Sequence, residues 1–137
     1  MRWLAKQGGF NLIKEYKMII WHRKFTLEVN YDLYPGEAVT ESQINLLNYF
    51  LKNKNILVKA KKEIKRYCDL AINADEDNRK KEDIFDYIMP DYIFVKHDDI
   101  KPRLALMCKY KYDPEHGLAI IYEKDGTISI GPQDEIL

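Results

Sequence analysis

The stretch that decides the fold is KYKYDPEHGLAIIYEKDGTISIGPQDEIL, residues 109–137, which closes the chain. Within it, the apolar segments Leu118–Glu123 and Thr127–Ile130 are separated by Lys124-Asp125-Gly126. Gly126 suits the positive φ that a tight hairpin turn requires, so the two segments are predicted to pair as a β-hairpin. A third strand is predicted just before them, because apolar and aromatic side chains occupy every second position from Leu104 to Tyr112.

The beginning of the chain also has the pattern of strands. Phe10–Tyr16, Lys17–Trp21 and Lys24–Tyr31 are predicted as three strands separated by tight turns. In the last of them apolar residues alternate with polar ones, which indicates an antiparallel strand with one buried face. Tyr92–Val95 is apolar throughout and predicts the return to sheet after the middle of the chain.

The middle of the chain is predicted to be helical. Thr40 and Gln43 form a capping box at the start of a helix over Thr40–Leu51, whose apolar residues recur at helical spacing. A second helix is predicted from Asn55, which is suited to cap it. The acidic stretch 75–78 is predicted to be a polar loop, and Lys80–Met89 a short third helix that stops at Pro90.

This order of strands, helices and strands predicts an α+β fold with a mainly antiparallel sheet of about six to seven strands and two to three helices packed on one face. A length of 137 residues suits a single domain over 1–137, with 1–9 expected to be a poorly ordered extension. Two cysteines, Cys68 and Cys108, suggest reduced thiols.

Charge and hydropathy limit the classes of partner. Lys and Arg together number 22, as do Asp and Glu, so the net charge of zero gives no reason to expect nucleic acid or an anionic membrane. The longest apolar run, Met18–Trp21, is far too short to span a bilayer. The N-terminus lacks the apolar core of a secretion signal, and the expected location is the cytoplasm.

The segment Asp113-Pro114-Glu115-His116-Gly117 is the first candidate site. Asp, Pro and Gly stand where a type I turn closed by a left-handed residue needs them, so the structural prediction is that Asp113 accepts backbone N–H bonds and Gly117 has positive φ. The alternative is a small-ligand or metal site built from Asp113, Glu115, His116 and Asp134. The usual zinc spacings are absent, and neither a metal nor a cofactor is expected.

Two other polar clusters have simpler explanations. Lys96-His97-Asp98-Asp99 reads as a solvated loop between strands. The acidic residues at 75–77 lack the spacing of a calcium loop.

The predicted second helix carries a basic face. Lys59, Lys62 and Arg66 fall opposite its apolar stripe, with Lys61 and Lys65 beside them. Such a row is either a solvated surface or a surface that steers an acidic protein partner. Nucleic acid is the weaker alternative, because the aromatic residues alternate along strands as core residues do and form no stacking platform.

The end of the chain resembles a known pattern. Cys108, Tyr112-Asp113-Pro114-Glu115-His116-Gly117, a Gly turn and Ile130-Gly131-Pro132-Gln133-Asp134-Glu135-Ile136-Leu137 are similar to the C-x-W-D-x-E-H-G and G-x-Q-D-x-x-L motifs of a family of small bacterial domains of unknown function. The likeness covers roughly residues 10–137, with Tyr112 in place of the usual Trp. Members of that family occur near polymorphic-toxin and immunity genes, so the resemblance implies toxin neutralisation or another protein-binding role.

The sequence therefore favours a non-enzymatic protein-binding module, in specific form an immunity protein, whose partner-binding residues are Lys59, Lys62 and Arg66 and whose partner is an acidic protein. The alternative is a small-ligand-binding protein or metal-dependent enzyme with its site near the DPEHG and QD turns.

Overall fold

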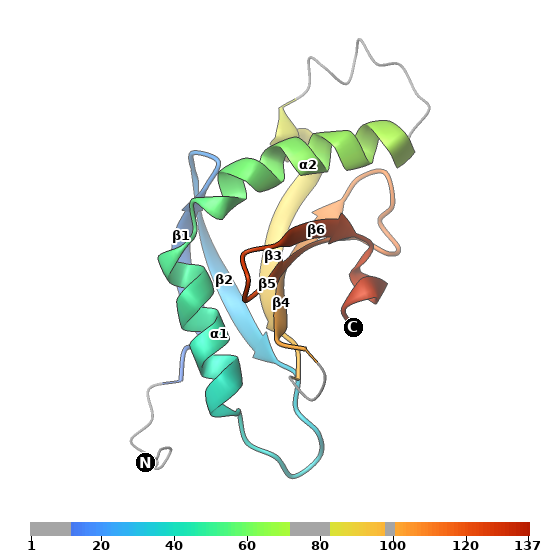
Figure 1. Cartoon of the computed structure of the whole chain (residues 1–137). Helices are drawn as coiled ribbons and strands as arrows, with labels where there is room; N and C mark the ends of the chain where they lie inside the picture. The colour runs from blue at the N-terminus through green and yellow to red at the C-terminus, as the bar shows by residue number, and fades with distance from the viewer. Residues whose placement is uncertain (1–11, 72–82, 98–100) are drawn as a thin grey trace.

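The computed structural model describes residues 12–71, 83–97 and 101–137. They form one six-stranded sheet, in the order β1-β2-β3-β4-β5-β6, together with two α-helices (Figure 1). The strands are β1 (Glu15–Ile20), β2 (Arg23–Tyr31), β3 (Ile88–Val95), β4 (Arg103–Tyr110), β5 (Leu118–Glu123) and β6 (Ile128–Gly131). The helices are α1 (Glu41–Lys52) and α2 (Ile56–Ala71), with single 3₁₀ turns η1 (Ile84–Asp86) and η2 (Gln133–Glu135).

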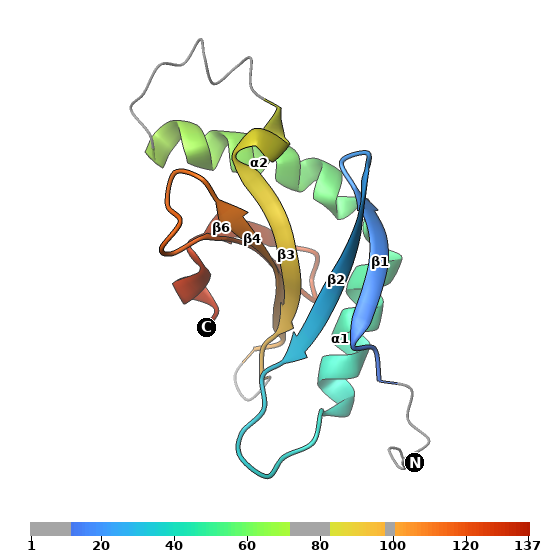
Figure 2. The ribbon, with the colours of Figure 1, turned by 180° about the vertical axis from the view of Figure 1, so that it is seen from behind.

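The topology is simple because every strand lies beside its neighbour in the chain. All these pairs are antiparallel except β2 and β3, which run parallel. A parallel pair needs a long crossover, and here the crossover carries both helices. The view from behind shows the curved sheet with the helices beyond it (Figure 2). The predicted α+β class, with helices on one face of a mainly antiparallel sheet, is confirmed.

The main core lies between the helices and one face of the sheet. It takes buried side chains from α1 such as Phe50, from α2 such as Ile64, and from strands β1 to β5. A second, smaller cluster on β4 and β5 is closed by Ile136 from the C-terminal end, which is fully buried. Strands β4 and β5 are therefore buried on both faces, and the C-terminal residues are part of the fold.

Helix α1 begins as the sequence predicts. The Thr40 hydroxyl accepts the Gln43 backbone N–H at 3.1 Å, and the Gln43 side chain accepts the Thr40 backbone N–H at 3.0 Å. Gln43 is also fully buried, and its Nε2 donates to the carbonyl of Asp32 at 2.9 Å. One side chain thus caps the helix and ties it to the end of the sheet.

The prediction of three strands at the beginning of the chain is wrong. The described part contains two, β1 and β2, because residues 15–20 run without a break where a turn was expected near Tyr16. Trp21, predicted at the end of a strand, instead forms the hairpin turn with His22, at φ 47° and 72°. A two-residue turn with positive φ matches the twist of the paired strands, although Asn and Gly are its usual residues.

The prediction of a third helix over Lys80–Met89 is also wrong for residues 83–89, the part of that range that the structure describes. Residues 80–82, like the polar loop 75–78, lie outside the described residues. From Asp83 the chain makes only the turn η1, in which the Asp83 side chain accepts the Phe85 N–H at 3.0 Å. Strand β3 then runs through Pro90, where the register with β4 shifts between Pro90 and Tyr92. A bulge is one of the few places where a sheet accepts proline, which has no N–H to donate.

The predictions for the remaining elements agree closely. Helix α2 starts directly after Asn55, β5 has the predicted bounds, and β6 begins one residue later than expected. Strand β4 ends at Tyr110 rather than Tyr112. No helix among the described residues has the length and apolarity to cross a membrane.

Candidate functional site

The turn Asp113–Gly117 has the structure that its sequence predicts. Gly117 has φ 63°, and its N–H donates to the Asp113 carbonyl at 2.8 Å. The Asp113 carboxylate accepts the His116 backbone N–H at 3.4 Å and contacts Nδ1 of the His116 ring at 3.1 Å. The side chains of Asp113 and His116 therefore serve the turn itself.

A second set of contacts joins this turn to the end of the chain. The Gln133 side chain donates through Nε2 to the Cys108 carbonyl at 3.1 Å, and its backbone N–H donates to the His116 carbonyl at 3.1 Å. A Cβ at Gly117 would lie only 2.6 Å from Gln133 Nε2 and 3.0 Å from the Cys108 oxygen. We call the contacts of Gln133 with Cys108 and His116 the C-terminal clasp. In this chain, the clasp leaves no room for a side chain at Gly117.

The four residues of the alternative site do not form a metal-binding group. Among residues 12–71, 83–97 and 101–137, no three His, Cys, Asp or Glu side chains are placed to hold a metal ion. Glu115, His116 and Asp134 are exposed. Cys108 is fully buried, and burial raises the pKa of its thiol, so it remains a protonated core residue rather than a nucleophile.

His116 is nevertheless electrostatically perturbed. Its hydrogen bond to Asp113 raises the pKa of the imidazole, and the charge of Asp113 adds to the effect, with smaller contributions from Glu115 and Asp134. The side chain is exposed, so the effect on the pKa reflects a local ion pair rather than a desolvated catalytic pocket.

The cluster around His97 is more ordered than a solvated loop. The His97 ring Nε2 lies 2.9 Å from a Glu37 carboxylate oxygen, and the Tyr34 ring stacks on the His97 ring with centroids 4.0 Å apart. The backbone N–H of His97 donates to the Asp32 carboxylate at 3.1 Å. These contacts attach the loop after β2 to the end of β3. Asp98 and Asp99, the rest of this predicted cluster, lie outside the described residues. Residues 32–37 lie far from His97 in the sequence, so no local sequence pattern predicts these contacts.

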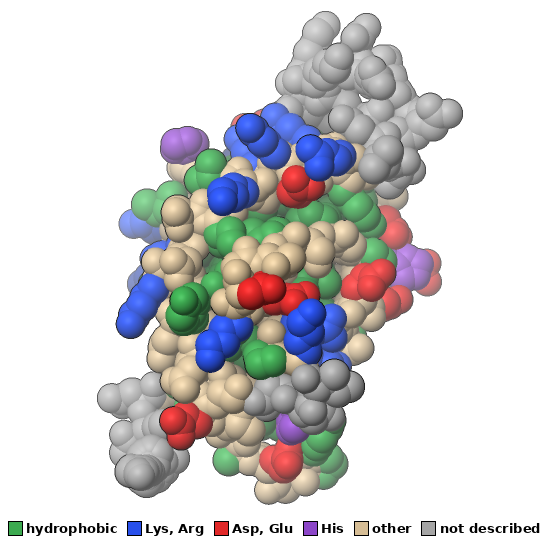
Figure 3. Space-filling view, in the orientation of Figure 1, with side chains coloured by type: hydrophobic (Ala, Val, Ile, Leu, Met, Phe, Trp, Pro, Cys, Tyr) green, Lys and Arg blue, Asp and Glu red, His purple; other side chains and the backbone are tan. Residues whose placement is uncertain are grey.

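The three predicted partner-binding residues all lie exposed on α2, and we call Lys59, Lys62 and Arg66 the basic ridge. Figure 3 shows Lys and Arg side chains gathered over α2, while acidic side chains and a histidine gather at the right edge of the same view. Arg66 forms an exposed ion pair with Glu63 at 3.2 Å. Lys65 is also exposed, whereas Lys61 is partly buried.

Two features beside the ridge were not found from the sequence. Val58, one turn before Lys62, is 69% exposed and adds an apolar side chain to this charged surface. The indole Nε1 of Trp21 donates to the Leu57 carbonyl at 2.8 Å, so the β1–β2 turn lies against the first turn of α2. Phe85 holds this corner together, with the Trp21 ring at 5.9 Å and the Arg23 guanidinium at 4.2 Å from its centroid.

The comparisons with known proteins place the chain in one family. Residues 6–137 match the model of a domain family of unknown function, DUF6985. Because the match covers nearly the whole chain, the protein belongs to that family. Neither the comparison with curated proteins nor that with solved structures found a match.

Proposed function

We propose that this protein is a non-enzymatic protein-binding module that uses the outer face of α2 to bind an acidic protein. The observation that carries the proposal is a contrast between two groups of polar residues. Asp113 and His116 contact each other within the turn and Gln133 forms the C-terminal clasp, whereas Lys59, Lys62 and Arg66 are exposed on a packed helix, where Arg66 also pairs with Glu63 of the same helix.

The arrangement of the ridge suits recognition of carboxylates. Its cations recur at intervals of three and four residues, so they follow one side of α2 over successive turns. Helix α2 packs on the core through Leu57, Ala60 and Ile64, so the backbone that carries the three cations is held in place. Exposed charges of this kind mainly accelerate and orient encounter with a partner of opposite charge.

Val58 supplies an apolar side chain beside the charges of the basic ridge. Interfaces combine an apolar centre with a polar rim, and burying one valine side chain contributes on the order of 1.5 kcal/mol. Val58 lies one turn from Lys62 on the same side of the helix, beside the Trp21 corner. An acidic partner with a small apolar patch between its carboxylates would fit this surface.

In its most specific form the acidic partner is a toxin domain and this protein is its immunity protein. The likeness of the C-terminal motifs to domains found beside toxin and immunity genes supports this form. A cognate toxin would then lose activity when it is mixed with this protein, and cells that express both would grow.

The test is capture of partners from lysate of the native host, with three baits. One bait is the wild type, the second carries Lys59→Glu, Lys62→Glu and Arg66→Glu, and the third carries the matched reversals Lys24→Glu, Lys109→Glu and Lys124→Glu at exposed positions away from α2. The proposal expects an acidic protein on the wild type and the third bait and its loss from the second. Equal capture by all three baits would contradict it.

A further inference from the structure

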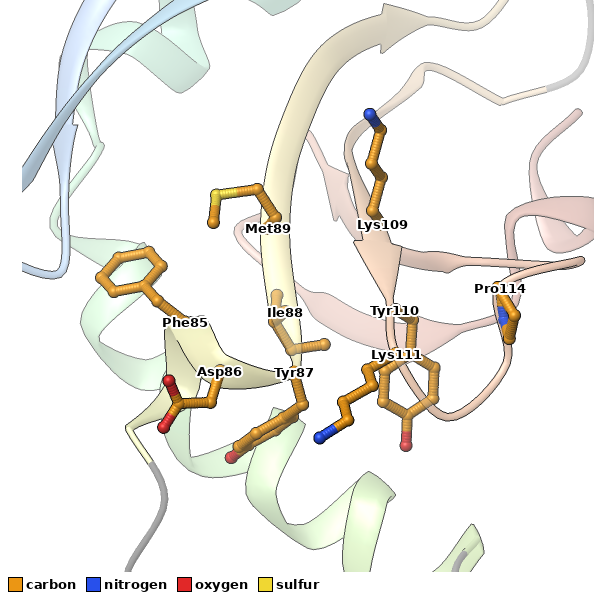
Figure 4. Close-up of a pocket in the computed structure, with 9 residues that line it drawn as sticks. All are labelled: Phe85, Asp86, Tyr87, Ile88, Met89, Lys109, Tyr110, Lys111 and Pro114. Atoms are coloured by element: carbon orange, nitrogen blue, oxygen red, sulfur yellow. The ribbon is translucent and has the colours of Figure 1, made fainter.

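A hollow of about 410 Å³ opens where η1 and the start of β3 lie beside the end of β4 (Figure 4). The ammonium groups of Lys109 and Lys111 point apart, and Phe85 and Met89 lie on the opposite side of β3 from Pro114. These side chains therefore do not converge on one ligand. The polar groups along the free edge of β1, by contrast, are arranged in one row.

Strand β1 is the outermost strand at one end of the sheet (Figure 2). The Lys14 carbonyl accepts the Val29 N–H at 2.8 Å, so the bonds to β2 use Lys14 and every second residue after it. The backbone N–H and C=O groups of Glu15, Lys17 and Ile19 therefore point away from β2. Among the described residues no other strand pairs with this edge, and such an edge is a template for a further strand.

The opposite edge of the sheet is protected. Strand β6 has only four residues, and helix α2 contacts it. Short edge strands and covering helices are two ways in which proteins prevent pairing with another chain. Strand β1 has six residues, and the side chains of Glu15, Lys17 and Ile19 are exposed on the face of the sheet away from the helices. Ile19 is 66% exposed, and pairing with a further strand would partly cover it.

The charges on β1 are complementary to a second copy of the same strand. Glu15 lies directly opposite Glu28 of β2, and within the described residues neither carboxylate forms an ion pair. Lys17, on the same face, lies opposite Thr26 and also has no carboxylate at ion-pair distance in that part of the chain. Like charges directly opposite each other destabilise a strand pair, so a cation on the free side of Glu15 would offset that cost.

We propose that the protein forms a two-fold symmetric dimer in which the β1 strands of two copies pair antiparallel through their free edges. With the axis at Tyr16, Glu15 of each copy lies opposite Lys17 of the other, in the hydrogen-bonded pairs of the ladder. An axis at Lys17 would place that lysine opposite itself, and an axis at Met18 would place it opposite Ile19. Charge complementarity therefore selects the axis at Tyr16 and a second copy of this chain as the partner. The dimer uses no residue of the basic ridge.

The experiment is sedimentation equilibrium of the whole chain at low salt, with Lys17→Glu, Glu15→Lys and the double variant that carries both changes. The wild type should form a dimer of twice the 16.3 kDa chain, with a Kd on the order of 100 µM because a single strand edge makes a small interface. Each single variant should weaken the dimer at least about tenfold, since both symmetric ion pairs become like-charge pairs. The double variant should dimerise like the wild type, because it only exchanges the two charges.

The two single variants also control for each other, since in their equimolar mixture every charge at these positions faces an opposite one. The mixture should therefore form a heterodimer although neither variant dimerises well alone. The Lys17 amide of the wild type should exchange with solvent more slowly at high than at low protein concentration. A wild type that stays monomeric up to about 1 mM would overturn the proposal. Single variants that dimerise normally, or no recovery in the double variant and the mixture, would contradict it equally.

Discussion

At the scale of single residues, Gly117 carries the strongest constraint. Its left-handed φ alone disfavours other residues, and a Cβ there would also meet Gln133 and the Cys108 carbonyl. Gly126 has φ 92° but nothing within 4 Å of the place where its Cβ would stand. Substituting Gly126 therefore tests the cost of positive φ alone, whereas substituting Gly117 adds the cost of a close contact between the new Cβ and its neighbours.

We predict that Gly117→Ala lowers the free energy of unfolding by about 2–3 kcal/mol and Gly126→Ala by only about 1 kcal/mol. The difference reflects the forced displacement of the Gln133 side chain from the clasp. Urea denaturation of both variants measures it. Equal losses in the two variants would mean that Gln133 does not restrict this position.

The pair Asp113–His116 gives a second prediction at this scale. The folded-state pKa of His116 is raised, so the pair adds stability below the ordinary imidazole pKa of about 6.5, and that contribution is lost as the pH rises through the raised value. Asp113→Asn should return the His116 pKa toward 6.5 and weaken this pH dependence. NMR titration of the imidazole checks it, and an unchanged pKa would contradict the assignment to Asp113.

At the scale of elements, the β1–β2 turn is the least expected feature. Both Trp21 and His22 adopt positive φ, which costs a residue with a side chain on the order of 1 kcal/mol. Trp21 is compensated by its hydrogen bond to Leu57 and its contact with Phe85. His22 is exposed, so its conformation follows from closing the turn.

His22→Gly should therefore stabilise the protein by about 0.5–1 kcal/mol, because glycine adopts positive φ without steric cost. Thr26→Gly in the extended part of β2 is the matched control and should destabilise by a similar amount. Thermal unfolding of both variants measures the effect. A lower melting temperature for His22→Gly would show that the histidine side chain has a stabilising contact.

The elements that could be predicted from the sequence are those specified by local chemistry. The Thr40–Gln43 capping box places α1, and the Lys124–Gly126 turn places the last hairpin. The third helix was mispredicted because Ile84, Phe85 and Ile88 fit a helical spacing, whereas pairing of β3 with both β2 and β4 decides the structure. Tertiary pairing is not encoded in a short window of residues.

In the candidate site, too, local sequence predicted some features, whereas contacts between distant residues were missed. Exposure of Lys59, Lys62 and Arg66 and the positive φ of Gly117 followed from local periodicity and turn chemistry. The clasp did not, because it joins Gln133 to Cys108, 25 residues away. The hollow where η1 and the start of β3 lie beside the end of β4 is lined by two separate stretches of the chain, within residues 85–89 and 109–114, and no pattern within either one predicts it.

At the scale of the whole molecule, the described residues include two local clusters of charge although the net charge of the chain is zero. The basic ridge lies over α2, and acidic groups surround His116 in the turn after β4. Reversing the ridge should change folding little, since exposed charges typically contribute under about 1 kcal/mol each. The reversal of Arg66 has a further small cost, because Glu63 then faces a like charge.

The most direct test of the central claim is the association rate constant with the captured partner at low salt, measured for three proteins. They are the wild type, the ridge variant Lys59→Glu, Lys62→Glu and Arg66→Glu, and His116→Gln in the DPEHG turn. We predict that the ridge variant associates at least about tenfold more slowly and loses the salt dependence seen in the wild type, while His116→Gln associates at the wild-type rate. A normal rate for the ridge variant, with a slow rate for His116→Gln, would contradict the claim and move the functional surface to the turn.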